Sequence, residues 1–144
     1  MLISPVSYRQ ITMHVSNNLQ SNYTSNLSFE RKQKEDFNIS ILDKNYISVQ
    51  ITDSKSNKMI GRAFFGHNSN EIEICADNNE VRQAAFDSLL RYIKENRHTV
   101  KFIVAKPRKD DKESVEFYKH NKFINKGTIN SAYGPRILCY LKIK

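Results

Sequence analysis

The sequence predicts a mixed α/β domain, in which a central mixed sheet of six to seven strands is flanked by about four helices. Two observations predict this fold class. Hydrophobic and polar residues alternate along segments between residues 46 and 77, which is typical of half-buried strands. The hydrophobic spacing then changes to every third or fourth position over residues 81–96, which is typical of an amphipathic helix. The 144 residues fit a single domain over residues 1–144 and are too few for two independent cores.

The N-terminal quarter predicts one strand, two helices and a polar, mobile segment at residues 16–36. Residues 1–5 form a short strand that a proline stops. Ser7 followed by Gln10 fits a capping box, and a helix is expected there because apolar residues recur at helical spacing, namely Tyr8, Ile11, Val15 and Leu19. Residues 27–37 predict a second, highly charged helix.

Three strands joined by two polar turns follow, and they predict an antiparallel meander. The strands are YISVQITD at 46–53, MIGRAFFGH at 59–67 and EIEICAD at 71–77, with turns at 54–58 and 68–70. The preceding ISILD segment would add a fourth strand.

The last strand of this meander alternates strictly between two faces. Ile72 and Ile74 lie on one face, and the other carries Glu71, Glu73 and Cys75. The isoleucines of one face are therefore candidates for the core, and the residues of the other face are candidates for binding or catalysis.

The C-terminal half predicts two helices and three strands. The helix at 81–96 has N-cap candidates at 77–79 and an apolar stripe made of Val81, Ala85, Leu89, Tyr92 and Ile93. VKFIVA is a short apolar run, typical of a strand covered on both faces. Asp110 and Glu113 fit a second capping box, and the short helix that they open ends at Asn121 in a left-handed conformation. FINKGTI and ILCYLKIK close the chain as two strands.

The net charge of +8 is concentrated in one half of the chain. Residues 91–144 hold 14 Lys and Arg against 5 Asp and Glu, giving +9, whereas residues 1–90 hold 9 against 10, giving −1. A basic half attracts nucleic acid, an acidic protein or a phosphate-rich ligand such as coenzyme A, and a solvated surface is the simpler explanation. The basic residues lack the aromatic interleaving of a strand-binding platform.

Several function classes are excluded at this stage. No apolar run approaches the roughly 20 residues that a membrane span needs, and the first residues do not resemble a signal peptide. Cys75 and Cys139 lie in apolar surroundings and are expected to be buried free thiols, which indicates a reducing, cytoplasmic compartment. Export of a virulence protein without a cleaved signal is the alternative. No spacing of Cys and His resembles a metal site.

The order of the predicted elements and three sequence segments resemble the GNAT acetyltransferase superfamily. The best match is residues 114–123, SVEFYKHNKF, which is similar to the family's A-x-x-(F/L)-Y-x-x-x-G-F segment, and Lys126-Gly127 continues it as a turn. Ile60-Gly61-Arg62-Ala63 is similar to the family's V-G-x-x at the start of the third strand. Residues 1–5 resemble the family's opening strand.

The resemblance implies an acetyl-CoA site. In the family, the pantetheine arm lies between two diverging strands, against backbone groups that correspond here to Glu73, Ile74, Cys75 and Ala76. The pyrophosphate binds at the start of the next helix, on a glycine-containing (Q/R)-x-x-G-x-(G/A) loop. The nearest segment here contains no glycine and ends in a carboxylate: Arg82, Gln83, Ala84, Ala85, Phe86 and Asp87. The alternative is that residues 78–81, NNEV, supply the turn, because Asn tolerates left-handed geometry.

The resemblance also implies catalytic roles. Tyr118 stands where many members keep a tyrosine that protonates the coenzyme A sulfur, and the alternative is a core tyrosine. Glu71 and Glu73 stand on the strand that often carries the family's general base, and the alternative is a solvated strand edge. A basic cluster before the last helix can meet phosphates or be solvated, and consists of Lys106, Arg108, Lys109 and Lys112.

Two functions of this fold remain open, beside a small basic DNA- or RNA-binding protein of unrelated fold, which no recognised nucleic-acid motif supports. The first is an N-acyltransferase that moves an acetyl group from acetyl-CoA to an amine of a protein or small molecule. The second is a catalytically degenerate module of the same fold, which binds a protein or nucleic-acid partner through its basic C-terminal half. The missing glycines favour the second function, and Tyr118 favours the first.

Overall fold

The computed structural model describes residues 11–14 and 37–144 of the chain. These residues form two compact units. The first unit contains residues 11–14, 37–64 and 74–90, and the second contains Phe65–Glu73 and Arg91–Lys144. Strands β5 and β6 and helix α2 contribute residues to both units.

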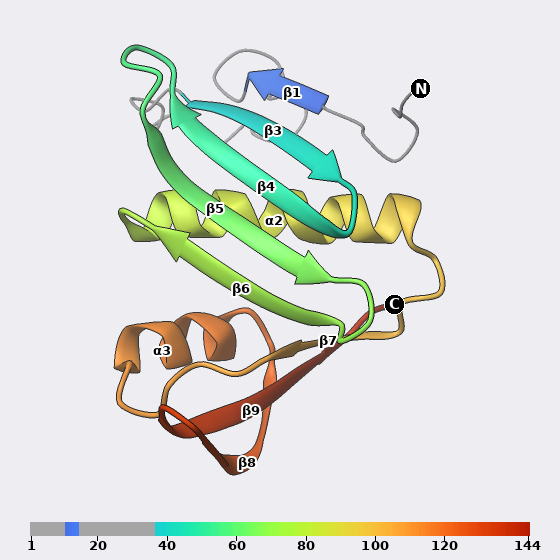
Figure 1. Cartoon of the computed structure of the whole chain (residues 1–144), viewed down its shortest axis with the longest axis vertical. Helices are drawn as coiled ribbons and strands as arrows, with labels where there is room; N and C mark the ends of the chain where they lie inside the picture. The colour runs from blue at the N-terminus through green and yellow to red at the C-terminus, as the bar shows by residue number, and fades with distance from the viewer. Residues whose placement is uncertain (1–10, 15–36) are drawn as a thin grey trace. The chain divides into compact units, whose positions relative to one another are not determined.

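The first unit is an antiparallel sheet with a helix packed against it (Figure 1). Its strands follow the order β1-β3-β4-β5-β6, with bounds Ile11–His14 for β1, Phe37–Asp43 for β3, Tyr46–Asp53 for β4, Met59–Gly66 for β5 and Glu71–Ala76 for β6. Helix α2 runs from Asn79 to Asn96. The expected meander is therefore confirmed, and ISILD does supply its additional strand.

Alternation along β3 and β4 creates the core of the first unit. Ile39, Ile41, Val49 and Ile51 are at most 3% exposed, and β3 pairs with β4 so that Ile39 lies opposite Ile51 and Ile41 opposite Val49. Directly opposed β-branched side chains are well suited to a pleated, buried surface. The predicted stripe of α2 is also buried, at 5% exposure or less for Val81, Ala85, Leu89, Tyr92 and Ile93.

The second unit is a smaller mixed sheet with one helix. Its strands follow the order β6-β7-β9-β8, with bounds Phe102–Ala105 for β7, Ile124–Ser131 for β8 and Gly134–Lys142 for β9, and helix α3 spans Lys112–His120. β7 runs parallel to β6, while β9 is antiparallel to both β7 and β8. The continuous apolar run predicted this placement, because Ile103, Val104 and Ala105 are all buried.

The element counts differ from the expectation. Within residues 11–14 and 37–144, eight strands and two helices are present, rather than six to seven strands and about four helices. Ile11–His14 was expected in a helix and forms β1, because the β-branched pair Ile11 and Thr12 adds to the edge of β3. Phe37, expected at a helix end, begins β3. The strand at 1–5 and the segment at 16–36 lie outside the described residues.

Helix α3 begins one residue later than expected. Its N-cap is Asp111, whose carboxylate accepts from the Ser114 backbone N–H at 3.2 Å and from the Ser114 hydroxyl at 2.8 Å. Asp110 was the expected cap, but the Arg108 guanidinium engages its carboxylate through two hydrogen bonds of 3.2 and 3.1 Å.

The end of α3 also differs by one residue. Asn121 has φ −93°, and the left-handed residue is Lys122 with φ 75°. The Lys122 N–H donates to the Lys119 carbonyl at 3.0 Å, and the Phe123 N–H donates to the Tyr118 carbonyl at 3.0 Å. These two bonds form a Schellman motif, in which the left-handed position is normally glycine. Lys122 thus occupies the position at which the resembling segment carries its glycine.

Candidate functional site

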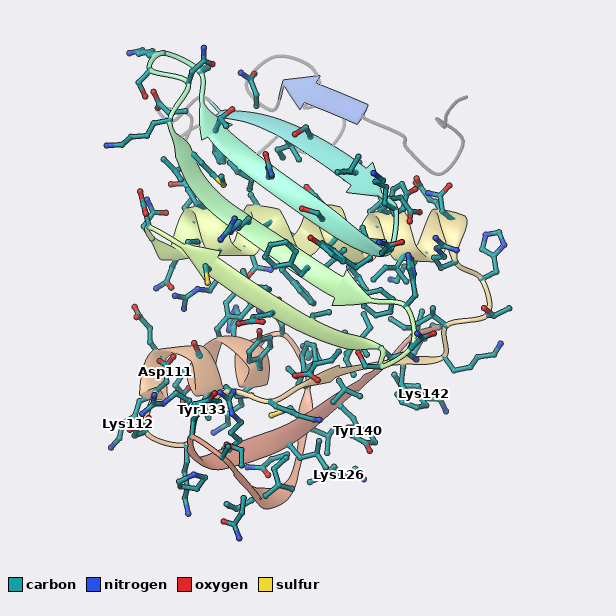
Figure 2. The ribbon with its side chains drawn as sticks, viewed as in Figure 1. Asp111, Lys112, Lys126, Tyr133, Tyr140 and Lys142 are labelled. Carbon is teal, nitrogen blue, oxygen red and sulfur yellow. The ribbon has the colours of Figure 1, made fainter. Side chains whose placement is uncertain are left out.

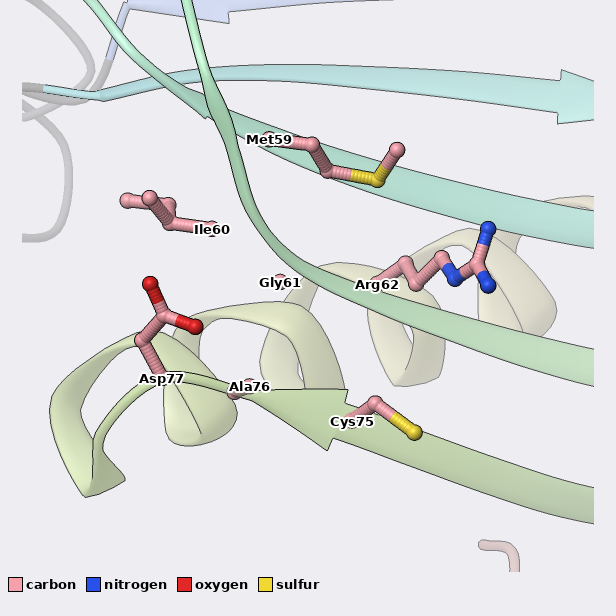
Figure 3. Close-up of a pocket in the computed structure, with 7 residues that line it drawn as sticks. All are labelled: Met59, Ile60, Gly61, Arg62, Cys75, Ala76 and Asp77. Carbon is pink, nitrogen blue, oxygen red and sulfur yellow. The ribbon is translucent and has the colours of Figure 1, made fainter.

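An open depression of about 400 Å³ lies where β5 begins and β6 ends (Figure 3). It belongs entirely to the first unit. Its lining is made of Met59, Ile60, Gly61, Arg62, Cys75, Ala76 and Asp77. Sequence reasoning had placed two of these residues, Cys75 and Ala76, at the cofactor.

Gly61 allows β5 to approach the first turn of α2. A Cβ atom at this position would lie 2.5 Å from Val81 Cγ1 and 3.4 Å from Ala76 Cβ. Val81 is fully buried, so it has no open space into which to move. The glycine of the Ile60–Ala63 segment is therefore required by packing beneath the depression.

The outward face of the depression carries a cation and a thiol. The Asp77 N–H donates to the Ile60 carbonyl at 2.9 Å, and this antiparallel register places Arg62 opposite Cys75. Both residues are exposed, and the Arg62 guanidinium carbon lies 5.3 Å from the centroid of the Phe64 ring. Cys75 was expected to be buried. It is exposed because it alternates with Ile74, whose side of β6 turns toward the core.

Residues 78–81, the alternative turn, form the start of α2, but Asn78 and Asn79 do not take the left-handed geometry that was expected of them. The Asn78 side chain accepts from the Val81 N–H at 2.9 Å, and the Arg82 N–H donates to the Asn78 carbonyl at 3.0 Å, so Asn78 caps the helix. The segment Arg82–Asp87 is not a loop before the helix, because it lies within the second and third turns of α2.

Asp87 is consequently removed from the helix start. Eight residues separate it from Asn79, which corresponds to about 12 Å along the helix axis. Its carboxylate is exposed and accepts from the Gln83 side-chain amide at 3.0 Å. The carboxylates nearest to the helix start are instead those of Asp77 and Glu80.

In the second unit, the pairing between β6 and β7 is short. Glu71 lies opposite Val104 and Ile72 opposite Ala105, and the described register contains no further pair. β7 ends at Ala105 and is followed by the buried Pro107, which has no N–H to donate. Glu73 of the same unit therefore lies outside the β6–β7 ladder.

The two candidate bases on β6 have different surroundings. The Glu71 carboxylate is 3.5 Å from the Lys106 ammonium, and both side chains are a little over one-third exposed. Glu73 is exposed on the same face of the strand, two residues further along. An ion pair of this kind contributes little to stability but occupies the Glu71 carboxylate.

Tyr118 lies among aromatic side chains and is only 6% exposed. Its ring meets Phe117 at 5.4 Å and Phe123 at 5.0 Å between centroids, both with edge-on geometry. The three rings pack together where α3 ends and the next strand begins. This contact explains why Phe117, Tyr118 and Phe123 occur together in one sequence segment.

The basic cluster between β7 and α3 is partly neutralised. Asp110 raises the pKa of the Arg108 guanidinium through hydrogen bonds, and Arg108 in turn lowers the pKa of Asp110. Lys106 pairs with Glu71, while Lys109 and Lys112 are exposed (Figure 2 labels Lys112 at the start of α3). No group of His, Cys, Asp and Glu that could hold a metal occurs in the described part of the chain.

Sequence reasoning missed Arg62, Met59 and Asp77 as lining residues. Arg62 was considered only as part of a glycine motif. The signal was present, because a glycine in a strand often marks a place where another backbone packs closely, and the arginine next to it on an alternating strand points to the opposite face. Asp77 was considered only as a helix cap, a role that Asn78 takes.

Several solved acetyltransferase structures are similar to this chain. The ribosomal-protein-S5-alanine acetyltransferase of Vibrio fischeri matches with a TM-score of 0.59 and 12% identity over 68% of this chain and 62% of its own. An N-acetyltransferase from Staphylococcus aureus Mu50 gives 0.57 and 15% over 69% and 68%. The ribosomal-protein-S18-alanine N-acetyltransferase of Escherichia coli gives 0.53 and 18% over 69% and 70%.

The similarity is one of structure. No protein-family model and no curated protein matches the sequence. The chain spans 62% of the length of the Vibrio fischeri structure and 64% of the length of a similar putative acetyltransferase structure from Acinetobacter baylyi ADP1, which is less than two-thirds in both cases. No helix among the described residues is long and apolar enough to cross a membrane. With a four-stranded meander, a long helix after β6, a parallel β7 and a closing antiparallel pair, the chain has the fold of the GNAT acetyltransferases.

Proposed function

We propose that this protein is an N-acyltransferase that moves an acetyl group from acetyl-CoA to an amine of a protein or small molecule. The observation that carries the proposal is the early end of the β6–β7 ladder after Ile72. Where a parallel ladder ends, the backbone N–H and C=O groups that follow have no partner from that ladder, and an amide-containing pantetheine chain can bond to such groups. Residues Ile74, Cys75 and Ala76 of β6 follow that point and would hold the cofactor.

Acetyl transfer needs three groups from the protein. A base removes a proton from the acceptor amine, a donor stabilises the oxyanion, and an acid protonates the departing thiolate. Glu73 is the better candidate for the base, because the carboxylate of Glu71 is already paired with Lys106. Glu71 would then hold Lys106 in place through this ion pair.

Tyr118 is the candidate acid. In the proposed step, the amine nitrogen attacks the thioester carbonyl, the C–S bond breaks, and the Tyr118 hydroxyl gives its proton to the sulfur. Its ring is held by Phe117 and Phe123, so a Tyr118→Phe variant keeps the packing and loses only the hydroxyl. Phosphate binding would rest on the first-turn N–H groups of α2, with Arg82 and Gln83 as half-buried side chains of the next turn.

Ligand binding tests the cofactor. With a micromolar dissociation constant, 1 mM acetyl-CoA should stabilise the protein by about 4 kcal/mol through mass action. An unchanged melting temperature would instead favour the second function, a degenerate module that keeps the fold without the cofactor. Acetyl-CoA tested against desulfo-coenzyme A would show whether the thioester end takes part.

Catalysis is tested by two matched tyrosine variants. Tyr118→Phe should lower kcat on a lysine-containing acceptor by about 100-fold, the lower end for a general acid, with little change in KM. Tyr92→Phe is the control, because Tyr92 is an equally buried tyrosine, 5% exposed, on α2. Product should be measured by mass spectrometry, since the exposed Cys75 reacts with thiol-detecting dyes. Equal rates for Tyr118→Phe and wild type would remove Tyr118 as the acid.

A further inference from the structure

We propose that one face of the second unit is a binding site for single-stranded nucleic acid. This outer face, as it is called below, consists of Phe102, Val104, Ile124, Arg136, Tyr140 and Lys142, which come from β7, β9 and β8. The proposal goes beyond acetyl transfer and does not depend on it.

The pairing registers place these residues on one side of the sheet. Phe102 lies opposite Lys142, Val104 opposite Tyr140, and Tyr140 opposite Ile124. Directly opposed residues point to the same face, and every second residue along a strand shares it. The reverse face is buried at Ile103, Ala105 and Cys139. On the outer face Val104 is buried as well, at 8% exposure, whereas Phe102, Ile124 and Lys142 are exposed.

Two aromatic rings dominate the outer face. Phe102 and Tyr140 stack with ring centroids 5.5 Å apart and planes inclined by only 8°. Phe102 is 42% exposed, an unusual value for a phenylalanine in the middle of a folded sheet. A planar base can extend this stack on the exposed side of Phe102, an interaction that tolerates any base because every base has a π-face.

Ile124 widens the apolar part of the outer face. It is 61% exposed and lies directly across from Tyr140 on the edge strand β8. The exposed Phe102 and Ile124, together with the half-buried Tyr140 that contacts Phe102 and lies opposite Ile124, form an apolar strip. Such a strip marks an interaction surface more often than scattered single residues do.

Cations border the strip at both ends of β9. Lys142 lies opposite Phe102, and at the other end the isolated bridge between Arg108 and Arg136 places two guanidinium side chains across from each other. Like charges in direct opposition are destabilising unless an anion or a carboxylate screens them, and here the Asp110 carboxylate screens Arg108. The Arg136 guanidinium is held by a hydrogen bond of 2.6 Å to the Lys106 carbonyl, which fixes it at the edge of the strip.

Net charge selects a polyanion as the occupant. The second unit contains 14 Lys and Arg and 7 Asp and Glu, giving +7. Strands β7, β8 and β9 carry no carboxylate, and the two on the neighbouring strand β6 are Glu71, which pairs with Lys106, and the exposed Glu73. Stacked rings bordered by cations suit bases and phosphates together, whereas an acidic polypeptide would use the cations and leave Phe102 and Tyr140 without a matching partner. Lys126, Tyr140 and Lys142 are labelled along β8 and β9 in Figure 2.

Fluorescence anisotropy with the full chain and a labelled single-stranded RNA of about 12 nucleotides tests the proposal. Binding is expected at about 150 mM salt, with affinity falling as salt rises because counterions are released. Phe102→Ala and Tyr140→Ala should each weaken binding by about tenfold, and Tyr140→Phe should retain it because the stacking surface remains. Lys142→Gln should flatten the salt dependence by about 0.7 in the log–log slope.

Two control variants isolate the outer face. Tyr133→Ala removes a tyrosine that is 80% exposed at the β8–β9 turn, and Lys94→Gln removes a cation from the last turn of α2. Neither should change the affinity. Thermal melting of every variant shows whether it is folded, and Tyr140→Phe and Lys142→Gln remain informative if an alanine variant unfolds.

Three outcomes would overturn the proposal. The first is no binding at about 150 mM salt. The second is equal affinity for single-stranded and duplex RNA, with no loss in Phe102→Ala, because charge alone would then explain it. The third is polyglutamate binding that depends on Phe102 and Tyr140 in the same way, which would assign the outer face to an acidic polypeptide.

Discussion

Gly61→Ala offers a direct test of the packing beneath the depression. The added Cβ would lie 2.5 Å from Val81 Cγ1, more than 1 Å inside normal carbon–carbon contact. Val81 and Ala63 are fully buried, so relief requires β5 and α2 to move apart. Overpacking of this kind costs about 1–3 kcal/mol. The loss of glycine entropy in the unfolded chain returns only about 0.4–1 kcal/mol, so the net effect is destabilising.

A double-mutant cycle separates the clash from other effects of the substitution. Val81→Ala removes Cγ1 and should by itself cost about 2 kcal/mol through lost burial and a cavity. In that background, Gly61→Ala should become neutral or slightly stabilising, because the new methyl group enters the vacated space. The coupling free energy between the two sites is expected to be about 2 kcal/mol.

Urea unfolding followed by circular dichroism measures all four members of the cycle. Gly66→Ala is the matched control, since its added Cβ would meet the hydroxyl of Ser69 at 2.7 Å, on an exposed turn that can adjust. If Gly61→Ala lowers the free energy of unfolding equally in the wild-type and the Val81→Ala background, the clash with Val81 is not its cause. The requirement for glycine would then lie in the strand backbone and not in the contact with α2.

Four further predictions concern the ends of α3 and the two thiols. Lys122→Gly should stabilise the protein by about 1 kcal/mol in urea unfolding, because glycine adopts φ 75° without the strain of a side chain. Asp111→Ala should destabilise by about 1 kcal/mol through loss of the cap, while Asp110→Ala, which removes only an exposed ion pair, should have little effect on the same curve. In the folded protein, a thiol reagent should modify Cys75 and spare Cys139, with both reacting in denaturant. Because burial raises the pKa of Cys139, its contribution to stability is complete below the ordinary thiol pKa of about 8.5 and is lost as pH rises through the higher folded value, which melting curves at alkaline pH would detect.

The described elements with a strong periodic pattern were predictable from sequence. The stripe of α2 from Val81 to Ile93 is buried as expected, because apolar residues spaced about 3.6 positions apart share one face of a helix, and that face packs against the core. The alternation of β4 and β6 fixed both the strands and their faces, including the outward position of Glu73. Both turns of the meander, at 54–58 and 68–70, are where polar residues cluster.

Competition between neighbouring residues was not predictable. Asp110 and Asp111 are chemically identical candidates for the cap, and only the fold decides which carboxylate Arg108 takes. Ile11–His14 could follow a helical or an extended pattern, because four residues carry too little periodicity to choose, and pairing with β3 decides it. The exposure of Cys75 depends on the same alternation that was recognised for Glu71 and Glu73, so the sequence did contain that signal.

The start of α2 determines whether this protein can bind the phosphates of a cofactor. A phosphate binds a helix start through first-turn N–H groups that no side chain has claimed. Here the Asn78 carboxamide already accepts from the Val81 N–H, and Asp77 and Glu80 add negative charge nearby. In a glycine-rich loop, those N–H groups stay open, because glycine offers no competing acceptor. Under the proposed function, a bound phosphate would therefore have to displace the Asn78 cap or use the other first-turn N–H groups, and otherwise the affinity for the cofactor would come mainly from β6.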